Sequence, residues 1–253
     1  MKTRGPQKKG AYKKRAHRGG RRRVGYSRTG GKVTALKTAT VPDRMVLKMK
    51  YVDNIVLSGV GGATRVFRLN SIYDPDTSIT NGHQPLGYDQ WDVFYQKYRV
   101  FKAVVTLKAT NSSSNSADTE QIGMCAIANS TFLGTNDSFF EQPHCKKALL
   151  SGRGGIDRVT MSYAVDLPRI LGQAPVVYKS NVNTAALFGA NPLETVNLGI
   201  FTRPIDGQST SLVSCEVSIT YFVELFDRSP VAISYPAGKD PDAVDATDGG
   251  FNQ

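Results

Sequence analysis

The chain has 253 residues, of which 40% are hydrophobic, so it is long enough to bury a core in one large domain or two small ones. Its cysteines, Cys125, Cys145 and Cys215, are odd in number and lack paired spacing. They imply neither a disulfide framework nor a zinc site, and they fit a reducing compartment. No signal peptide and no apolar run of about 18 residues is present, so the sequence predicts neither secretion nor a membrane span.

Positive charge is concentrated at the N-terminus. Residues 1–32 hold 13 of the 32 lysines and arginines and no acidic residue. The other 221 residues hold 19 cations and all 21 acids, so the net charge of +11 divides into +13 and −2. Seven glycines and the lack of apolar periodicity predict that residues 1–32, the basic arm, are disordered when free.

An unbalanced basic arm of this kind predicts nucleic-acid binding through counterion release, with no base readout. The predicted binding residues are Lys2, Arg4, Lys8, Lys9, Lys13, Lys14, Arg15, Arg18, Arg21, Arg22, Arg23, Arg28 and Lys32. Seven of them also match a nuclear localisation signal, namely Lys13, Lys14, Arg15, Arg18, Arg21, Arg22 and Arg23. Tyr12 and Tyr26 offer rings for base stacking.

After this arm, β-branched and aromatic stretches alternate with clusters of Gly, Pro, Asn and Asp. They predict eight strands, over residues 44–57, 64–70, 99–110, 119–129, 146–151, 157–166, 195–203 and 212–226. Alternation is clearest from Val213 to Val223 and indicates one buried face. We expect three parts: an arm and linker (1–42), a β domain (43–235) and an acidic polar tail (236–253).

Between two of these strands the period changes. Trp91, Phe94, Tyr95 and Tyr98 have the spacing of one helix face, which predicts a short helix over 88–98 with its aromatic side chains in the core. Eight unevenly spaced strands with little helix predict an all-β fold, namely a single jelly roll of two packed antiparallel sheets. A Greek-key barrel of another kind is the alternative.

Residues suited to catalysis or metal binding do not form a recognisable pattern. Gly25–Lys32 resembles a phosphate-binding loop but has the wrong spacing and no preceding strand. His144 adjoins Cys145, but neighbours on a strand point to opposite faces, which separates a nucleophile from its base. Asp74 and Asp76 fit an Asp-Pro turn better than a cation site shared with another subunit. We therefore predict no enzyme activity, no cofactor and no metal site.

Two motifs in the first half of the β domain resemble a known family. The run from Asn70 to Pro75 reads NSIYDP, and the segment from Pro85 to Trp91 reads PLGYDQW. Tyr95, Tyr98, Arg99 and Val100 follow in order. Together with the basic arm, these residues resemble the capsid proteins of small circular single-stranded DNA viruses that encode a replication initiator, the circovirus-like group. The arm departs from the dense arginine tract of circoviruses because glycines interrupt it and lysines are mixed in.

The resemblance implies a jelly-roll shell subunit that assembles with itself into an icosahedral capsid of sixty copies. It also implies that the arm faces inward to a single-stranded DNA genome, and that host import machinery carries the protein to the nucleus before it becomes part of the virion. The capsid of a small RNA virus and a cellular nucleic-acid-binding protein with a basic tail are the alternatives. Candidate subunit contacts are Phe132, Phe139 and Phe140.

Overall fold

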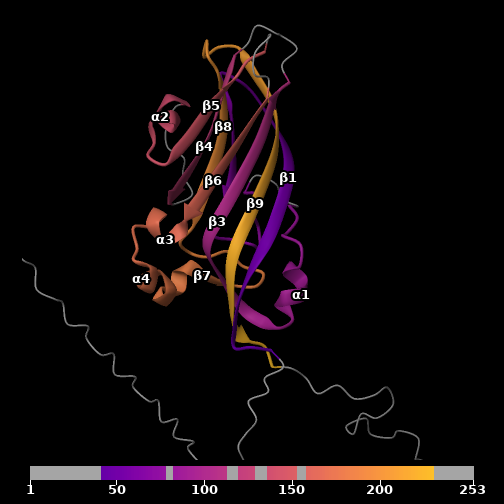
Figure 1. Ribbon diagram of the computed structural model, residues 1–253, viewed down its shortest axis with the longest axis vertical. Helices are drawn as coiled ribbons and strands as arrows, with labels where there is room; N and C mark the ends of the chain where they lie inside the picture. Colours follow the sequence, from indigo (N-terminus) through magenta and orange to yellow (C-terminus); the bar gives the residue numbers. More distant parts are fainter. Residues whose placement is uncertain (1–40, 78–81, 113–118, 129–135, 153–157, 231–253) are drawn as a thin grey trace, which may run out of the picture. The chain divides into compact units, whose positions relative to one another are not determined.

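Two antiparallel sheets make up the computed structural model, which describes residues 41–77, 82–112, 119–128, 136–152 and 158–230 (Figure 1). The strands of the first sheet, in spatial order, are β1 (Arg44–Val60), β9 (Thr210–Arg228), β3 (Tyr95–Asn111) and β6 (Arg158–Asp166), and the short β7 (Ala185–Leu187) also pairs with β3. Those of the second sheet are β2 (Ala63–Arg68), β8 (Val196–Pro204), β4 (Glu120–Ala128) and β5 (Cys145–Leu150).

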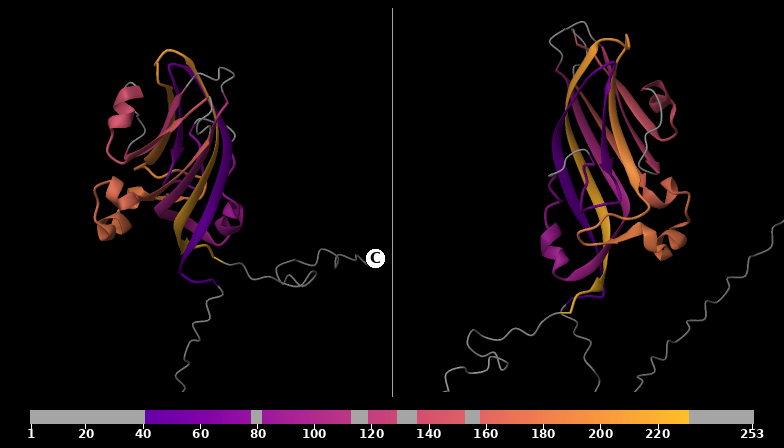
Figure 2. Two further views of the ribbon diagram at one scale, coloured as in Figure 1. Left: turned by 45° about the horizontal axis from the view of Figure 1, so that its top comes forward. Right: turned by 180° about the vertical axis from the view of Figure 1, so that it is seen from behind.

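With β7 set aside, consecutive strands lie in different sheets except β4 and β5, which are neighbours in the second sheet. β1 leads to β2, β3 to β4, β5 to β6 and β8 to β9, and each of these connections crosses from one sheet to the other. With β7 set aside, the two strands of each of these pairs hold equivalent positions in the two four-stranded layers. Figure 2 shows the two layers from two further sides. This is a jelly roll, and the predicted fold class is confirmed.

The core lies between the sheets because one face of each strand is apolar. On β9, Val217, Ile219 and Tyr221 are fully buried, whereas the residues between them are partly exposed, as the alternation predicts. The second sheet contributes the fully buried Phe67, Ile122, Met124, Leu198 and Ile200. Burying one such side chain contributes about 1.5–3 kcal/mol, so these rows supply much of the stability of the domain.

All eight predicted strands are present, with bounds within four residues of those expected. The largest difference is at β3, which begins at Tyr95 rather than near Arg99. β7 was not predicted because three residues in a long connection give no periodic signal.

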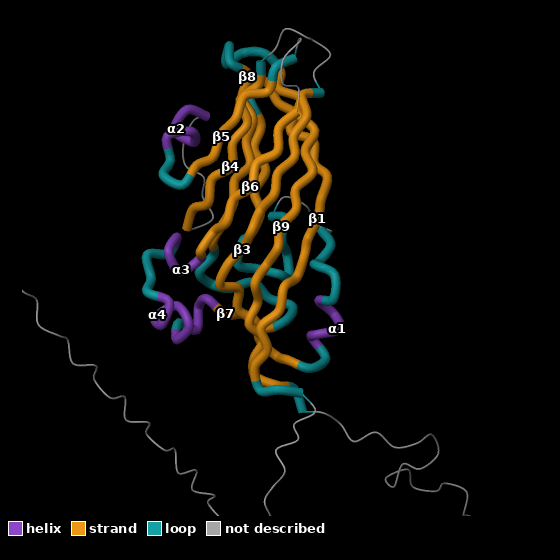
Figure 3. Tube along the Cα trace, viewed as in Figure 1, coloured by secondary structure: helices purple, strands orange, loops and turns teal. Residues whose placement is uncertain are grey.

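Short helices occupy the connections between strands (Figure 3). They are α1 (Tyr88–Asp92), α2 (Asn136–Glu141), α3 (Leu167–Ile170), α4 (Pro175–Ser180) and the 3-10 turn η1 (Val182–Thr184). The sequence indicated only the first, and the expected helix over 88–98 is wrong beyond Asp92. Tyr95 and Tyr98 belong to β3, where they pair with Arg228 and Leu225 of β9. The ladder supplies long-range hydrogen bonds that local helical spacing cannot reveal.

Candidate functional site

The predicted nucleic-acid-binding and nuclear-localisation residues, from Lys2 to Lys32, lie outside the described residues. The structure does describe where the chain enters the domain. Arg228 donates a hydrogen bond from Nη1 to the carbonyl of Val41 at 2.9 Å, and the Tyr95 hydroxyl donates to the carbonyl of Pro42 at 2.9 Å. The entry point is therefore bound to the ends of β9 and β3, at the end of the sandwich where β9 also finishes (Figure 1).

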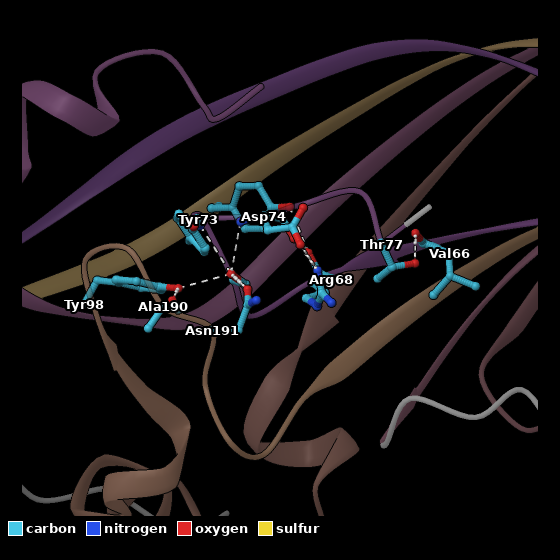
Figure 4. A network of polar contacts seen from close by, with 10 residues as sticks. Val66, Arg68, Tyr73, Asp74, Thr77, Tyr98, Ala190 and Asn191 are labelled. Carbon is cyan, nitrogen blue, oxygen red and sulfur yellow. Dashed lines mark hydrogen bonds and ion pairs between the residues drawn. The ribbon is translucent and has the colours of Figure 1, made fainter. Parts of the chain in front are cut away.

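The motif Asn70–Pro75 follows β2 and is fixed by a buried polar network (Figure 4). Ser71 is fully buried; its hydroxyl donates to Asn191 Oδ1 at 2.6 Å and lies 3.1 Å from the Tyr98 hydroxyl. The Tyr98 hydroxyl is also 2.7 Å from the carbonyl of Ala190, to which it donates. Asn70 donates from Nδ2 to the carbonyl of Glu194 and accepts at Oδ1 from the amide of Val196. The motif therefore attaches the loop after β2 to the segment before β8.

The carboxylates of this loop already have basic partners. Asp76 is fully buried, and Arg65 donates to its Oδ2 from Nε at 2.9 Å and from Nη2 at 2.7 Å. Asp74 forms a short ion pair with Arg68. Two fixed arginines leave little negative charge for a cation. No group of three or more His, Cys, Asp or Glu side chains suited to a metal occurs within the described part of the chain.

We expect Ser71→Ala to lower the free energy of unfolding by about 1–3 kcal/mol, because buried partners lose their hydrogen bonds. Urea denaturation followed by circular dichroism measures the change. Ser180→Ala, which removes an exposed hydroxyl on α4 that donates to a backbone carbonyl, is the matched control and should change stability by less than about 0.5 kcal/mol. Equal effects at the two positions would contradict a structural role for the motif.

The second motif, Pro85–Trp91, forms the turn into α1. Gly87 has a φ of 91°, a left-handed conformation that favours glycine. Tyr88 is buried and its hydroxyl accepts a hydrogen bond from the amide of Gly189 at 2.7 Å. Burial raises the pKa of Tyr88 to about 12, so the phenol stays neutral at physiological pH. Both motifs therefore anchor loops to the 187–196 segment.

A long connection between β6 and β8 carries α3, α4, η1 and β7, and it is held by Arg99 of β3. Arg99 is buried; it donates from Nε to the Thr184 hydroxyl and from Nη2 to the carbonyl of Asn181, both at 3.2 Å. Its Nη1 lies 3.7 Å from Glu224. Burial lowers the pKa of Arg99, and the charge of Glu224 opposes this shift. These contacts fix residues 167–195, which we call the insertion, against the first sheet.

Large apolar side chains are exposed in two groups at the same end of the sandwich. One group surrounds α1 and consists of Leu86, Val93 and Phe94, of which Leu86 is 92% exposed. The other lies on the insertion and consists of Val176, Val177, Val182, Leu187 and Leu193. α1 and the insertion helices lie on opposite sides of the domain (Figures 1 and 2). Clusters of exposed apolar residues are typical of protein contact surfaces.

The expected contact residues on α2 are corrected by the structure. Phe139 is only 7% exposed, and its ring centre lies 3.9 Å from that of the buried Phe201. Phe140 packs against the same ring at 4.5 Å. Phe139 thus belongs to a small apolar cluster outside the second sheet, and the prediction that it faces another subunit is wrong. Phe132 lies outside the described residues.

The outer face of the first sheet carries lysines beside an aromatic ring. Lys48 of β1 and Lys102 of β3 flank Phe222 of β9 in one cross-strand row. Their ammonium groups lie 5.1 and 5.4 Å from the centre of the Phe222 ring. These three residues are far apart in the sequence, and only the register of three strands places them side by side. For this reason the sequence did not predict the row.

The two histidines of the β domain have different surroundings in the structure. The His83 ring stacks on Tyr51 at 4.5 Å, and His144 has a φ of 66° in the turn before Cys145. Within the described ranges, no helix combines the length and apolarity that a membrane crossing requires.

Comparison with known proteins gives no matching family model and no matching curated protein. Solved structures with a similar fold include that of Desmodium yellow mottle tymovirus, with 11% identity, 81% of this chain and 100% of that chain covered, and a TM-score of 0.43. A decameric BFDV capsid protein is 11% identical, with 73% of this chain and 99% of that chain covered and a TM-score of 0.41. The protein of a virus-like particle of the nodavirus of the prawn Macrobrachium rosenbergii is 10% identical, with 76% of this chain and 100% of that chain covered and a TM-score of 0.43. At these values the likeness concerns the fold alone.

Proposed function

We propose that this chain is a viral capsid protein whose jelly roll assembles into a closed icosahedral shell and whose basic arm binds the packaged genome. The observation that carries the proposal is the division of charge: 13 unopposed cations in residues 1–32 precede a remainder of the chain, residues 33–253, whose net charge is −2. A nucleic-acid-binding module usually spreads its positive charge over the folded domain. Here the domain and the polyanion-binding segment have separate tasks, as a shell and its packaging arm require.

The exposed apolar groups support self-assembly. The group around α1 and the group on the insertion are different surfaces, and the part of the second group on α4 lies across the domain from α1 (Figure 1). A contact between the first surface of one copy and the second surface of the next is heterologous, and such contacts close into rings when the rotation between copies allows it. Rings of this kind are the building blocks of an icosahedral shell, here of sixty copies.

The genome in this proposal is single-stranded DNA, which rests on the resemblance of the motifs at 70–75 and 85–100 to circovirus-like capsid proteins. A small RNA virus is the alternative, since phosphate neutralisation by the arm does not distinguish the two nucleic acids. The row of Lys48, Phe222 and Lys102 offers a further contact for either polymer. Digestion of nucleic acid extracted from purified particles with DNase or RNase distinguishes the two.

Electron microscopy of the purified protein tests the shell. We expect uniform closed particles from the full chain. Removal of residues 1–32 should leave a β-rich domain that still forms shells or smaller oligomers without bound nucleic acid, because the strands between Arg44 and Arg228 build the core of the described residues. A monomer at all concentrations would favour a cellular nucleic-acid-binding protein. Loss of the β signal in circular dichroism on deletion would show that the arm is part of the fold.

The basic cluster between Lys13 and Arg23 gives a prediction about location. Fused to a fluorescent protein, residues 1–32 should bring the reporter into the nucleus through host import receptors, because clustered cations are what these receptors bind. Replacement of Arg21, Arg22 and Arg23 by alanine should lower the nuclear-to-cytoplasmic ratio, which is measured by microscopy. A reporter that stays in the cytoplasm would contradict nuclear entry but not shell formation.

A further inference from the structure

Two of the three cysteines lie opposite each other on neighbouring strands of the second sheet. Cys125 of β4 is the register partner of Cys145 of β5. Residues opposite each other in a ladder point to the same face, and both cysteines contact the apolar cluster of Phe139 and Phe201 on the outer face of this sheet. The thiols are free, and they share one small compartment beneath α2.

The type of strand pair follows from a neighbouring glycine. Gly123 lies opposite Lys147, and a Cβ built on Gly123 would be 3.2 Å from the carbonyl oxygen of Lys146. That carbonyl therefore points toward β4, as it does when the pair Gly123–Lys147 is of the non-hydrogen-bonded kind. Pair types repeat every two residues, so Cys125 and Cys145 also form a non-hydrogen-bonded pair.

In such a pair the Cα atoms are about 4.5 Å apart, and this lies at the short end of the range that a disulfide spans, about 4.4–6.8 Å. The Cβ atoms start slightly too far apart, at about 4.5–5.5 Å, and need a small approach. β5 allows this movement because, within the described part of the chain, it is the last strand of its sheet and pairs only with β4. Cys215, in contrast, is buried between the sheets on β9, away from this cluster.

We propose that Cys125 and Cys145 are a reversible disulfide site, oxidised by a small-molecule disulfide such as glutathione disulfide. The Cys145 thiolate attacks one sulfur of the oxidant, and one glutathione leaves as a thiolate that takes up a proton. The Cys125 thiolate then attacks the Cys145 sulfur of the mixed disulfide and expels the second glutathione. Two protein thiols are oxidised and one glutathione disulfide is reduced to two glutathione molecules.

Exposure sets the order of these steps. Cys145 is half-buried and meets the oxidant first, whereas Cys125 is fully buried and reacts with its neighbour. Burial raises the pKa of Cys125 to about 12 and also raises that of Cys145, where the charge of Lys147 opposes the shift. A small thiolate fraction makes the exchange slow. The site therefore suits a lasting transfer from reducing to oxidising surroundings better than rapid signalling.

The bond would attach the last strand of the second sheet to its neighbour and enclose the segment that contains α2. A disulfide that closes the loop between Cys125 and Cys145 should raise Tm by roughly 5–10 °C. The bond forms in oxidising surroundings and is reduced again in the cytosol. The site follows from the strand register and from the apolar cluster that both cysteines contact, so it goes beyond the capsid proposal and does not depend on it.

The test incubates the full-length protein with millimolar glutathione disulfide, in parallel with a reduced sample, until thiol titration is constant. We expect one free thiol after oxidation instead of three. Cleavage after Glu141 separates the two cysteines, so mass spectrometry under non-reducing conditions should find the two peptides joined, with the loss of two hydrogen atoms. Differential scanning calorimetry should show the rise in Tm, and a reducing agent should reverse it.

Cys145→Ala and Cys215→Ala are the matched variants. Cys145→Ala should keep both remaining thiols free and show no rise in Tm, whereas Cys215→Ala should still form the bond. Cys145 lies at the start of a strand and is partly exposed, so its replacement leaves the fold intact. Three free thiols after oxidation of the native protein would overturn the proposal. Glutathione retained on Cys145 without linkage to Cys125 would also overturn it.

Discussion

A peptide of residues 1–32 is expected to lose roughly 4 × 10³- to 3 × 10⁵-fold in affinity for a single-stranded oligonucleotide when salt rises from about 50 to 200 mM. Each lysine or arginine that neutralises a phosphate releases a counterion. On single strands this gives a slope of log K against log salt of about −0.7 per contact. If most of the 13 cations engage, the slope is roughly −6 to −9. Fluorescence anisotropy across a salt series measures it.

Charge number should matter more than charge identity in this binding. Exchange of every arginine in the peptide for lysine is the matched control and should leave the slope nearly unchanged, since both carry one charge. Replacement of Arg21, Arg22 and Arg23 by alanine should make it shallower by about 2. Base composition should matter weakly, because only Tyr12 and Tyr26 can stack. A flat salt response, or a preference of about 100-fold (2.7 kcal/mol) for one sequence, would show a shaped reading site instead.

Aspartate substitutions in either exposed apolar group are expected to abolish particles while leaving the subunit folded. Leu86 is 92% exposed beside α1, and Leu193 is 84% exposed on the insertion, so neither supports the core. An aspartate buried in a contact between copies loses hydration without gaining a partner. A cost of about 3 kcal/mol per contact raises the protein concentration needed for assembly by more than about 100-fold.

Sedimentation velocity and negative-stain electron microscopy measure the loss for Leu86→Asp and for Leu193→Asp. Val56→Asp is the matched control, because Val56 is 62% exposed but lies on β1, away from both groups. Circular dichroism and Tm should match the unmodified protein in all three variants. Normal particles from both leucine variants would place the subunit contacts elsewhere. Loss of particles in the Val56 variant as well would indicate a general effect of added charge.

The polar network around Ser71 shows that the sequence can mark a motif without revealing the residues that it contacts. The runs 70–75 and 85–91 stand out in the sequence. In the structure each run binds its own loop to the segment 187–196. Their partners, Asn191 and Gly189, are 120 and 101 residues away in the chain and lie in a segment with no periodic pattern. Sequence spacing therefore marks such residues but does not reveal what they hold.

Local patterns in the sequence determined the strands of this protein and the distribution of its charge. Alternating apolar residues fixed the strands and the buried face of β9, because a two-residue period admits only one assignment of faces. The separation of 13 cations in residues 1–32 from a remainder of net charge −2 is likewise a property of the sequence alone, since charge counts need no coordinates.

Register and long-range pairing were decided only in three dimensions. The ladder with β9 ends α1 at Asp92 and takes Tyr95 into β3, because many hydrogen bonds outweigh one turn of favourable helical spacing. Arg99 fixes an insertion that lies about 80 residues later in the chain. Cys125 and Cys145 have no spacing that suggests a pair, and only the antiparallel register of β4 and β5 brings them face to face.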